Sequence, residues 1–228
     1  MFQSKTFVIL TGASKGFGQA LACSLAREFS QNIPGKESVL VLVARSKKGL
    51  DETRRMVATI SSDLNVHVVP GDLSDVSNLD KLTSSIFGIV DPKQFSCAVL
   101  INNAGSLGDK IKSIPNHTDV NKIRTYMDLN ITSSFYLTSR FINHFSAAKN
   151  YVIHISSLCG IQPTPSLSLY CTGKAAKDMF HQVLALESED IRVLNYAPGP
   201  MYTEMFDDIM NNSDSDELRK MFVEMKTE

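Results

Sequence analysis

Six short runs of β-branched and aliphatic residues recur along this chain, separated by longer segments whose apolar residues repeat at helical spacing. Each run is apolar almost throughout, which is typical of strands covered on both faces of a parallel sheet. A regular alternation of strand and helix requires right-handed crossovers between parallel strands. The sequence therefore predicts an α/β fold with a doubly wound parallel sheet and helices on both faces. The predicted strands are residues 6–10, 39–43, 66–69, 98–101, 151–155 and 193–196.

The segments between these strands predict the helices. They cover residues 17–29, 50–60, 76–87, 118–147 and 169–187, and Asp75 or Ser74 is expected to cap the third of them. No repeat, low-complexity block or linker divides the chain, so we expect residues 1–228 to form a single domain. The acidic stretch 204–217 and the amphipathic piece after it predict a surface loop and a helix.

Composition excludes several classes of function. The chain has 23 Lys and Arg against 24 Asp and Glu, and this balance lacks the excess of basic residues expected of a nucleic-acid-binding protein. No apolar run approaches the ~18 residues that a membrane helix needs, and the N-terminus does not resemble a secretory signal. Four cysteines without a CxxC pair, and histidines without ligand spacing, give no disulfide framework or metal site. We therefore expect a cytoplasmic protein without metal, membrane or nucleic-acid partners.

The first predicted strand runs directly into a glycine-rich turn that opens a helix. Glycines allow a tight turn and the close approach of a pyrophosphate, while the free N–H groups of the helix N-terminus attract negative charge. Glycines also mark plain turns, but the place of this one after the first strand favours a dinucleotide site. The candidate cofactor-binding residues here are Gly12, Ser14, Lys15, Gly16, Phe17 and Gly18.

The end of the second strand indicates which dinucleotide is bound. NAD sites usually place an acidic residue there for the ribose hydroxyl, whereas this strand is followed by Arg45 and Ser46. A guanidinium can hold a 2′-phosphate through two parallel hydrogen bonds, and Lys15 can add a second positive charge. The alternative is that Arg45 only caps a surface loop. We favour NADPH or NADP as the cofactor.

Two further groups of polar residues follow later strands. Asn103 belongs to the stretch 102–105 directly after the fourth strand, where α/β sheets bind ligands, although an Asx turn, which Asn and Gly also favour, is the alternative. Ser157 follows the fifth strand, and Tyr170 and Lys174 share one face of the next helix. A nearby ammonium lowers the pKa of a tyrosine from its usual ~10, which suits general acid–base catalysis. A serine hydroxyl can hydrogen-bond a carbonyl oxygen on which charge develops.

Together these pieces resemble the short-chain dehydrogenase/reductase family, whose fold is of the Rossmann type. The stretches that carry the resemblance are TGASKGFG, NNAG, the helix with Asn130, Ser157 and YCTGK, and it covers residues 5 to about 205. The resemblance implies that Tyr170 is the catalytic acid, that Lys174 binds the nicotinamide ribose and lowers the tyrosine pKa, and that Ser157 orients the carbonyl. By the same resemblance Asn130 holds a proton-relay water, Asp72 and Leu73 contact adenine, and Thr203 lies at the nicotinamide. The implied substrate contacts are Ser157, Leu158, Tyr170 and Gly199.

Within that family the chain most resembles the sepiapterin reductases, through INNAGSLGD, ISSLCGIQP, LYCTGKAAKDM and RVLNYAPGP. This resemblance implies NADPH-dependent reduction of the side-chain ketones of a pterin, in a cytoplasmic homodimer whose interface uses the helices 118–147 and 169–187. Such reductases continue with a further strand and helix and an Asp that anchors the pterin, and we expect both elements to be absent here. Alternatives are a reductase of other small carbonyls or diketones, a weakly catalytic dinucleotide-binding protein and, with little support, another nucleotide binder such as a methyltransferase.

Overall fold

An all-parallel sheet of six strands, in the order β3-β2-β1-β4-β5-β6, organises the part of the chain that the structure describes. The structure is a computed structural model, and it describes residues 5–32, 38–108 and 111–227. The strands are β1 (Thr6–Thr11), β2 (Val39–Ala44), β3 (Asn65–Pro70), β4 (Cys97–Asn102), β5 (Lys149–Ile155) and β6 (Ile191–Tyr196). Every predicted strand is confirmed, and each differs from its prediction by one or two residues at one or both ends.

Side-chain alternation divides the interior into two layers, one on each face of the sheet. Strands β1, β2 and β4 are buried along their whole length, which explains why they are apolar on both sides. Val8 and Leu10 face one layer, while Phe7 and Ile9 face the other. The reversal of strand order at β1 places the ends of β1 and β4 beside each other, where doubly wound folds bind ligands.

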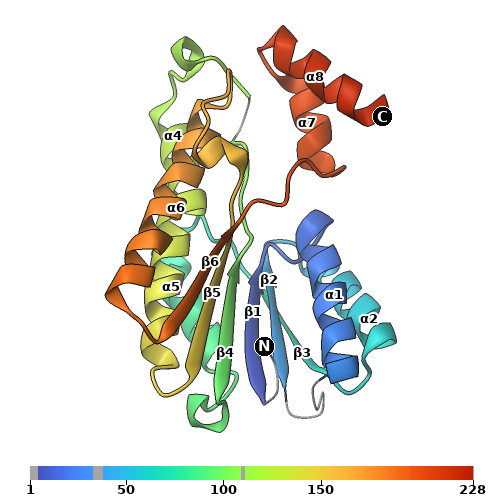
Figure 1. Cartoon of the computed structure of the whole chain (residues 1–228), viewed down its shortest axis with the longest axis vertical. Helices are drawn as coiled ribbons and strands as arrows, with labels where there is room; N and C mark the ends of the chain where they lie inside the picture. Colours follow the sequence, from blue (N-terminus) through green and yellow to red (C-terminus); the bar gives the residue numbers. More distant parts are fainter. Residues whose placement is uncertain (1–4, 33–37, 109–110, 228) are drawn as a thin grey trace.

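Helices cover both faces, as the sequence predicts. Helices α1 (Gly16–Asn32) and α2 (Lys47–Ile60) pack on the first layer, on the right in Figure 1. Helices α3 (Leu79–Phe87), α5 (Ser133–His144) and α6 (Ser168–Glu187) cover the opposite face. On the side of α1 and α2, Leu194 and Tyr196 of the edge strand β6 are about half exposed.

The third predicted helix begins differently from the expectation. A 3-10 turn, Val76–Asn78, precedes α3, and Asp75 stands before it without a side-chain cap hydrogen bond. Its carboxylate instead accepts from the side chains of Ser77 and Asn78, at 2.5 and 2.7 Å. Ser74 donates its hydroxyl to Asp72. The predicted cap by Asp75 or Ser74 is therefore wrong, because nearby side chains compete for both groups.

The long helix predicted over 118–147 is interrupted by a π turn. Helix α4 (Val120–Met127) passes through this turn, Asp128–Thr132, into α5. The side chain of Asn130 donates to the carbonyl of Tyr126 (3.0 Å), and Ser133 donates to the carbonyl of Leu129 (2.6 Å). These side chains satisfy carbonyls that an ordinary α-helical turn would pair with backbone N–H groups, which allows the helix to widen.

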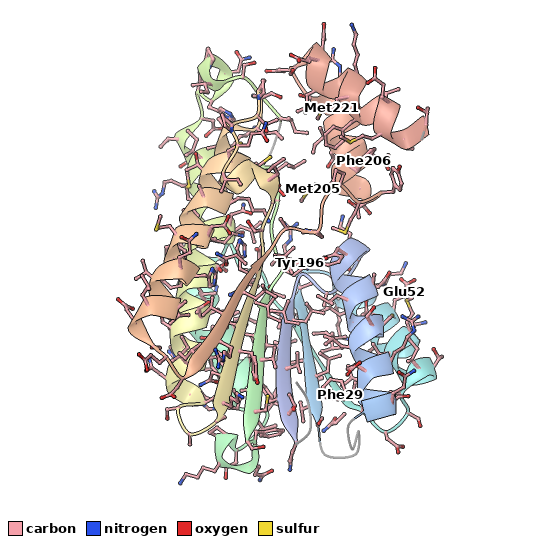
Figure 2. The ribbon with its side chains drawn as sticks, viewed as in Figure 1. Phe29, Glu52, Tyr196, Met205, Phe206 and Met221 are labelled. Carbon is pink, nitrogen blue, oxygen red and sulfur yellow. The ribbon has the colours of Figure 1, made fainter. Side chains whose placement is uncertain are left out.

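The C-terminal part forms a helical pair beyond the carboxyl ends of the strands (Figures 1 and 2). Helix α7 (Glu204–Asn212) and helix α8 (Asp216–Thr227) take in most of the acidic stretch, which the sequence predicted as loop and helix. Ile209 and Leu218 join a small apolar cluster with Leu107, Ile111 and Leu167, separate from both sheet layers. Among the described residues there is no seventh strand. No helix there is long and apolar enough to cross a membrane.

Candidate active site

The glycine-rich turn joins β1 to α1. Any residue larger than glycine at Gly12 or Gly18 would place its Cβ against neighbouring atoms. Gly12 and Gly16 adopt positive φ angles of 68° and 56°, which L residues rarely adopt. A Cβ on Gly18 would lie 2.2 Å from the carbonyl oxygen of Gly12, so only glycine fits at this contact. The turn therefore presents bare backbone at the N-terminus of a helix, which suits a pyrophosphate.

Asn103 supports this turn from the neighbouring strand. Its side-chain amide donates to the carbonyl of Thr11 (2.9 Å) and to that of Gly12 (3.3 Å). Its backbone N–H and that of Ala104 both donate to the Thr11 hydroxyl, each at 3.0 Å. The side-chain amide is therefore committed to shaping the turn, a role the sequence did not separate from cofactor contact.

The two basic residues predicted for the cofactor are both exposed, one in the turn and one after β2. Arg45 is exposed directly after β2, and Ser46 caps α2 by accepting from the N–H of Gly49 (3.1 Å). Lys15 is exposed and forms an ion pair with Glu204, at the start of α7. The exposed guanidinium of Arg45 lies where an acidic residue stands in NAD sites.

The remaining predicted contact residues differ in exposure. Asp72 accepts from the N–H and hydroxyl of Ser74, at 2.9 and 2.7 Å, and Leu73 is buried. Thr203 lies beside Gly16, since a Cβ built there would be 3.6 Å from its methyl group. At the predicted substrate side, Leu158 and Gly199 are exposed, and Gly199 has a φ of 80°.

The structure brings Ser157, Tyr170 and Lys174 together at the carboxyl end of β5. The Ser157 hydroxyl acts on Tyr170 by lowering its pKa, and it accepts from the N–H of Cys159 (3.2 Å). The Nζ atom of Lys174 lies 5.3 Å from the centre of the Tyr170 ring and donates to the carbonyl of Ile155 at 2.6 Å. A hydroxyl pair with a buried ammonium beside it can donate a proton to an oxygen and stabilise the charge that develops.

The expected lowering of the Tyr170 pKa by Lys174 is not found, because burial outweighs it. Burial raises the pKa of Tyr170 to about 12, although the hydrogen bond from Ser157 opposes that rise. Burial also lowers the pKa of Lys174 to about 8, and the nearby Asp178 carboxylate works against this change. The spacing argument considered only the attraction between the two groups, whereas desolvation is the larger effect on both.

Asn130 lies in the π turn and contacts the loop after β4. Its side chain is buried, and its Oδ1 atom accepts from the N–H of Ser106 at 3.0 Å. A Cβ on Gly105 would lie 3.2 Å from that oxygen. The widened helical turn therefore ties α4 and α5 to the loop after β4.

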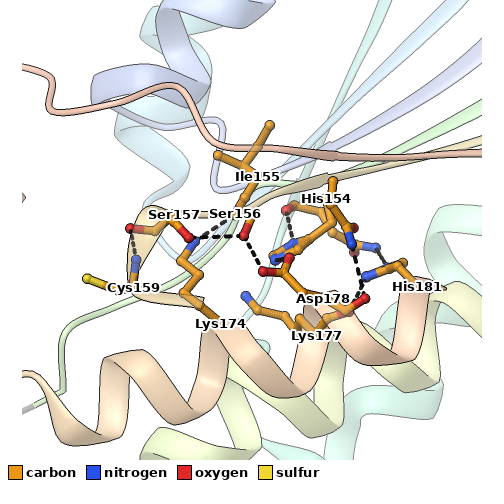
Figure 3. Close-up of polar contacts among 11 residues, drawn as sticks. His154, Ile155, Ser156, Ser157, Cys159, Lys174, Lys177, Asp178 and His181 are labelled. Atoms are coloured by element: carbon orange, nitrogen blue, oxygen red, sulfur yellow. Dashed lines mark hydrogen bonds and ion pairs between the residues drawn. The ribbon is translucent and has the colours of Figure 1, made fainter. Parts of the chain in front are cut away.

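Sequence analysis did not identify two other parts of the site. Tyr126 is buried, and its hydroxyl would lie 2.5 Å from a Cβ on Gly173, so α4 and α6 approach closely beside Tyr170. Below Lys174, a cluster of polar side chains is buried between α6 and β5 (Figure 3). The spacing of residues 174, 177, 178 and 181 on one helix face was the available signal for that cluster. In the described ranges, no group of His, Cys, Asp and Glu is arranged to hold a metal ion.

Comparisons with known proteins agree with this geometry. The family model for short chain dehydrogenases matches residues 6–214. Sepiapterin reductase from Rattus norvegicus is 41% identical over 223 residues, 96% of this chain and 83% of the rat protein. The Bos taurus sepiapterin reductase is 38% identical over 97% of this chain and 82% of its own length.

Solved structures share the fold. A short-chain dehydrogenase/reductase from Saccharomyces cerevisiae has a TM-score of 0.79 and 26% identity, covering 98% of this chain and 83% of the yeast chain. A short-chain dehydrogenase from Sphingobium yanoikuyae, solved with NADPH, has a TM-score of 0.73 and 27% identity. The match covers 89% of this chain and 73% of the Sphingobium chain. The match to the family model spans most of this chain. The protein therefore belongs to the short-chain dehydrogenase family of oxidoreductases.

Proposed function

We propose that this protein is an NADPH-dependent carbonyl reductase that reduces the side-chain ketones of a pterin such as sepiapterin or pyruvoyl-tetrahydropterin. The observation that carries the proposal is the assembly of Ser157, Tyr170 and Lys174 at the end of β5, at the same edge of the parallel sheet as the glycine-rich turn. The 38–41% identity to rat and bovine sepiapterin reductases supports the choice of substrate.

The residues at the turn fit NADPH. Backbone freed of side chains at Gly12, Gly16 and Gly18 accommodates the pyrophosphate, and Arg45 with Lys15 would hold the 2′-phosphate. When bound, NADPH supplies a hydride for the carbonyl carbon. Lys15 would exchange its ion pair with Glu204 for the phosphate, since the two side chains are about 70% exposed and their pairing contributes little to stability.

The protein's own groups handle the carbonyl oxygen. The Ser157 hydroxyl would hydrogen-bond this oxygen, and the Tyr170 hydroxyl would give it a proton as negative charge builds there. The high pKa of Tyr170 keeps its proton in place at neutral pH until that charge develops. The Lys174 ammonium would offset the charge left on the phenolate, and Asn130 would hold the water through which the proton is replaced.

The wall beside Tyr170 suits a flat ring. Tyr170 packs against the cluster that includes Leu107, Leu167 and Ile209, with Met205 and Phe222 at its border. Apolar side chains with a few polar groups at one end are the usual lining of a small-molecule site. Helices α7 and α8 therefore contribute one side of the proposed substrate site.

A homodimer in the cytoplasm completes the proposal. Met179, Val183 and Leu186 of α6 are exposed apolar residues, on a helix expected at the interface. Sedimentation at micromolar concentration should give a dimer. A monomer that is nevertheless active would contradict this part.

Turnover of sepiapterin with NADPH tests the proposed function, with simple diketones as competing substrates. A higher kcat/KM for sepiapterin than for diacetyl is expected. The reverse order would favour the broader reductase. Binding of NADPH without turnover of either substrate would favour a dinucleotide-binding protein that does not catalyse reduction.

A further inference from the structure

The face of α6 that packs on the sheet is polar, where a core-facing helix is usually apolar. Its buried residues are Gly173, Lys174, Lys177, Asp178 and His181. Lys177 and His181 are at most 1% exposed, and Asp178 is 7% exposed. Burying such groups costs free energy unless they pair, and apolar residues of similar volume would often be at least as stable. The polar face therefore calls for an explanation beyond packing.

Two adjacent residues at the end of β5 hold two groups of α6 (Figure 3). The carbonyl of Ile155 accepts from Lys174 Nζ at 2.6 Å, and the hydroxyl of Ser156 donates to Asp178 Oδ2 at 2.7 Å. Lys174 and Asp178 are one helical turn apart on the same face of α6. The strand end thus fixes an ammonium and a carboxylate as neighbours directly behind Ser157.

The loop after Ser157 leaves space for this carboxylate. A Cβ on Gly160 would lie 2.3 Å from Asp178 Oδ2 and 3.5 Å from the Ser156 hydroxyl. The other oxygen of Asp178, Oδ1, lies 3.7 Å from His154 Nε2, and neither atom has a hydrogen-bond partner among the residues that the structure describes. Oδ2 of Asp178 is therefore held by the Ser156 hydroxyl, while Oδ1 is free to interact electrostatically with the buried charges nearby, such as Lys174.

The two histidines are neutral neighbours of this pair. Burial lowers the pKa of His181 to about 4 and lowers the pKa of His154 further. His181 Nδ1 lies 2.8 Å from the carbonyl of Lys177, so that nitrogen carries the proton, and Nε2 can accept from Asn102 at 3.4 Å. The histidines therefore do not neutralise Asp178.

The titratable groups around Lys174 and Asp178 come from three elements, and Tyr126 on α4 faces Tyr170. They are Tyr170, Lys177 and His181 on α6 itself, His154 on β5, and Cys159 in the turn after it. Asp178 is the carboxylate in this group, and it directly follows Lys177 and lies four residues after Lys174, both of which are buried. A buried ammonium without an opposite charge nearby tends to lose its proton.

We propose that Asp178 is a positioning residue of the reductase: held by Ser156, its carboxylate keeps the buried ammonium of Lys174 protonated and aligned with Tyr170. This inference rests on the proposed function only in that Lys174 serves catalysis. Without Asp178, Lys174 would lose its proton at a lower pH. The reaction would then lack the Lys174 ammonium over that part of the pH range. The carboxylate would thus set the upper pH limit of activity.

Asp178→Asn tests this proposal, because it keeps the shape and removes the charge. Titration of Lys174 Nζ by NMR with nitrogen-labelled lysine needs no substrate, and Lys174→Arg assigns the signal. We expect the midpoint of Lys174 to fall by about one pH unit or more, as expected for loss of an opposite charge nearby. The high-pH limb of kcat/KM should move down by the same amount. Glu187→Gln, an equal charge change at the exposed end of α6, is the matched control. It should change neither the titration midpoint of Lys174 nor the high-pH limb of kcat/KM.

Either an unchanged midpoint in Asp178→Asn or an equal shift in Glu187→Gln would overturn the proposal. If Asp178→Asn does not fold, Ser156→Ala provides the test, since it frees the carboxylate without removing its charge. The Lys174 midpoint should then fall by about half a unit, and no change would contradict the role. A chain that reduces no carbonyl would contradict the proposed function, while the lysine titration would still decide the role of Asp178.

Discussion

Tyr170 shows how strongly burial governs a single residue in this protein. A tyrosine beside a lysine suggests a lowered pKa, yet burial raises the pKa of Tyr170 to about 12 while it lowers that of Lys174 to about 8. The two shifts have one cause, because desolvation disfavours the charged form of each group. The sequence predicted which residues meet, but their surroundings depend on α4, the π turn and loops that no local spacing describes.

Replacing Tyr170 by Phe removes a proton donor and very little volume. We expect NADPH binding within about twofold of the original and a loss of kcat of ~10²-fold or more, typical of a general acid. Fluorescence titration and steady-state kinetics measure the two effects. Tyr136→Phe on helix α5, where the tyrosine hydroxyl donates to Asp80, is the control and should retain activity. Full activity in Tyr170→Phe would contradict the assigned role.

Replacing Arg45 by Asp should change cofactor preference rather than turnover. Loss of a charge-assisted contact with the 2′-phosphate costs about 2 kcal/mol, or roughly 30-fold in affinity for NADPH. NADH has no such phosphate and should bind no more weakly than before. Arg55→Asp on α2, an exposed arginine away from the turn, serves as the control. Equal loss for both cofactors would show that Arg45 does not contact the phosphate.

At the scale of elements, strands were the most predictable part and the helical details the least. The apolar runs of β1, β2 and β4 are unambiguous because both faces of each strand are buried. The π turn at Asn130 depends on side chains that bond carbonyls four residues earlier, which periodicity does not reveal. The polar face of α6 was visible in the sequence, but the partner strand that pairs with it was not.

The Asn130 side chain holds the π turn and the loop after β4 together. Asn130→Ala would remove two hydrogen bonds and leave the N–H of Ser106 without its acceptor. We expect a loss of about 2 kcal/mol in unfolding free energy and a fall in Tm of roughly 4–8 °C for a chain of this size. Calorimetry measures this change. The exposed Asn121 of α4 is the matched control, and an equal effect of Asn121→Ala would contradict the account.

On the scale of the whole molecule, the helical pair α7–α8 stands apart from both layers of the sheet. Its apolar residues form a separate cluster that reaches Tyr170, and Lys15 joins it to the glycine-rich turn through Glu204. The sequence predicted the amphipathic end of this region, but its position over the site comes from contacts with residues about 100 positions earlier, such as Asp214 with Ser113 and Asn116.

Because the cluster is separate, α7–α8 can loosen without opening the sheet. Leu218 is buried there, and Leu218→Ala should weaken its packing by about 2–5 kcal/mol. We expect faster proteolysis near residues 197–203 and a severalfold higher KM for the carbonyl, with the affinity for NADPH little changed. Met221→Ala, at a 40% exposed position on α8, should have little effect. Unchanged proteolysis and KM in Leu218→Ala would show that this pair does not form part of the substrate site.

The central claim is tested most directly by following the loss of NADPH absorbance when the 228-residue chain is mixed with sepiapterin, with NADH as the parallel cofactor. The structure and its relatives lead us to expect steady turnover with NADPH and little with NADH. Binding of NADPH without oxidation in the presence of sepiapterin would contradict the claim that Ser157, Tyr170 and Lys174 form the active site of a pterin reductase.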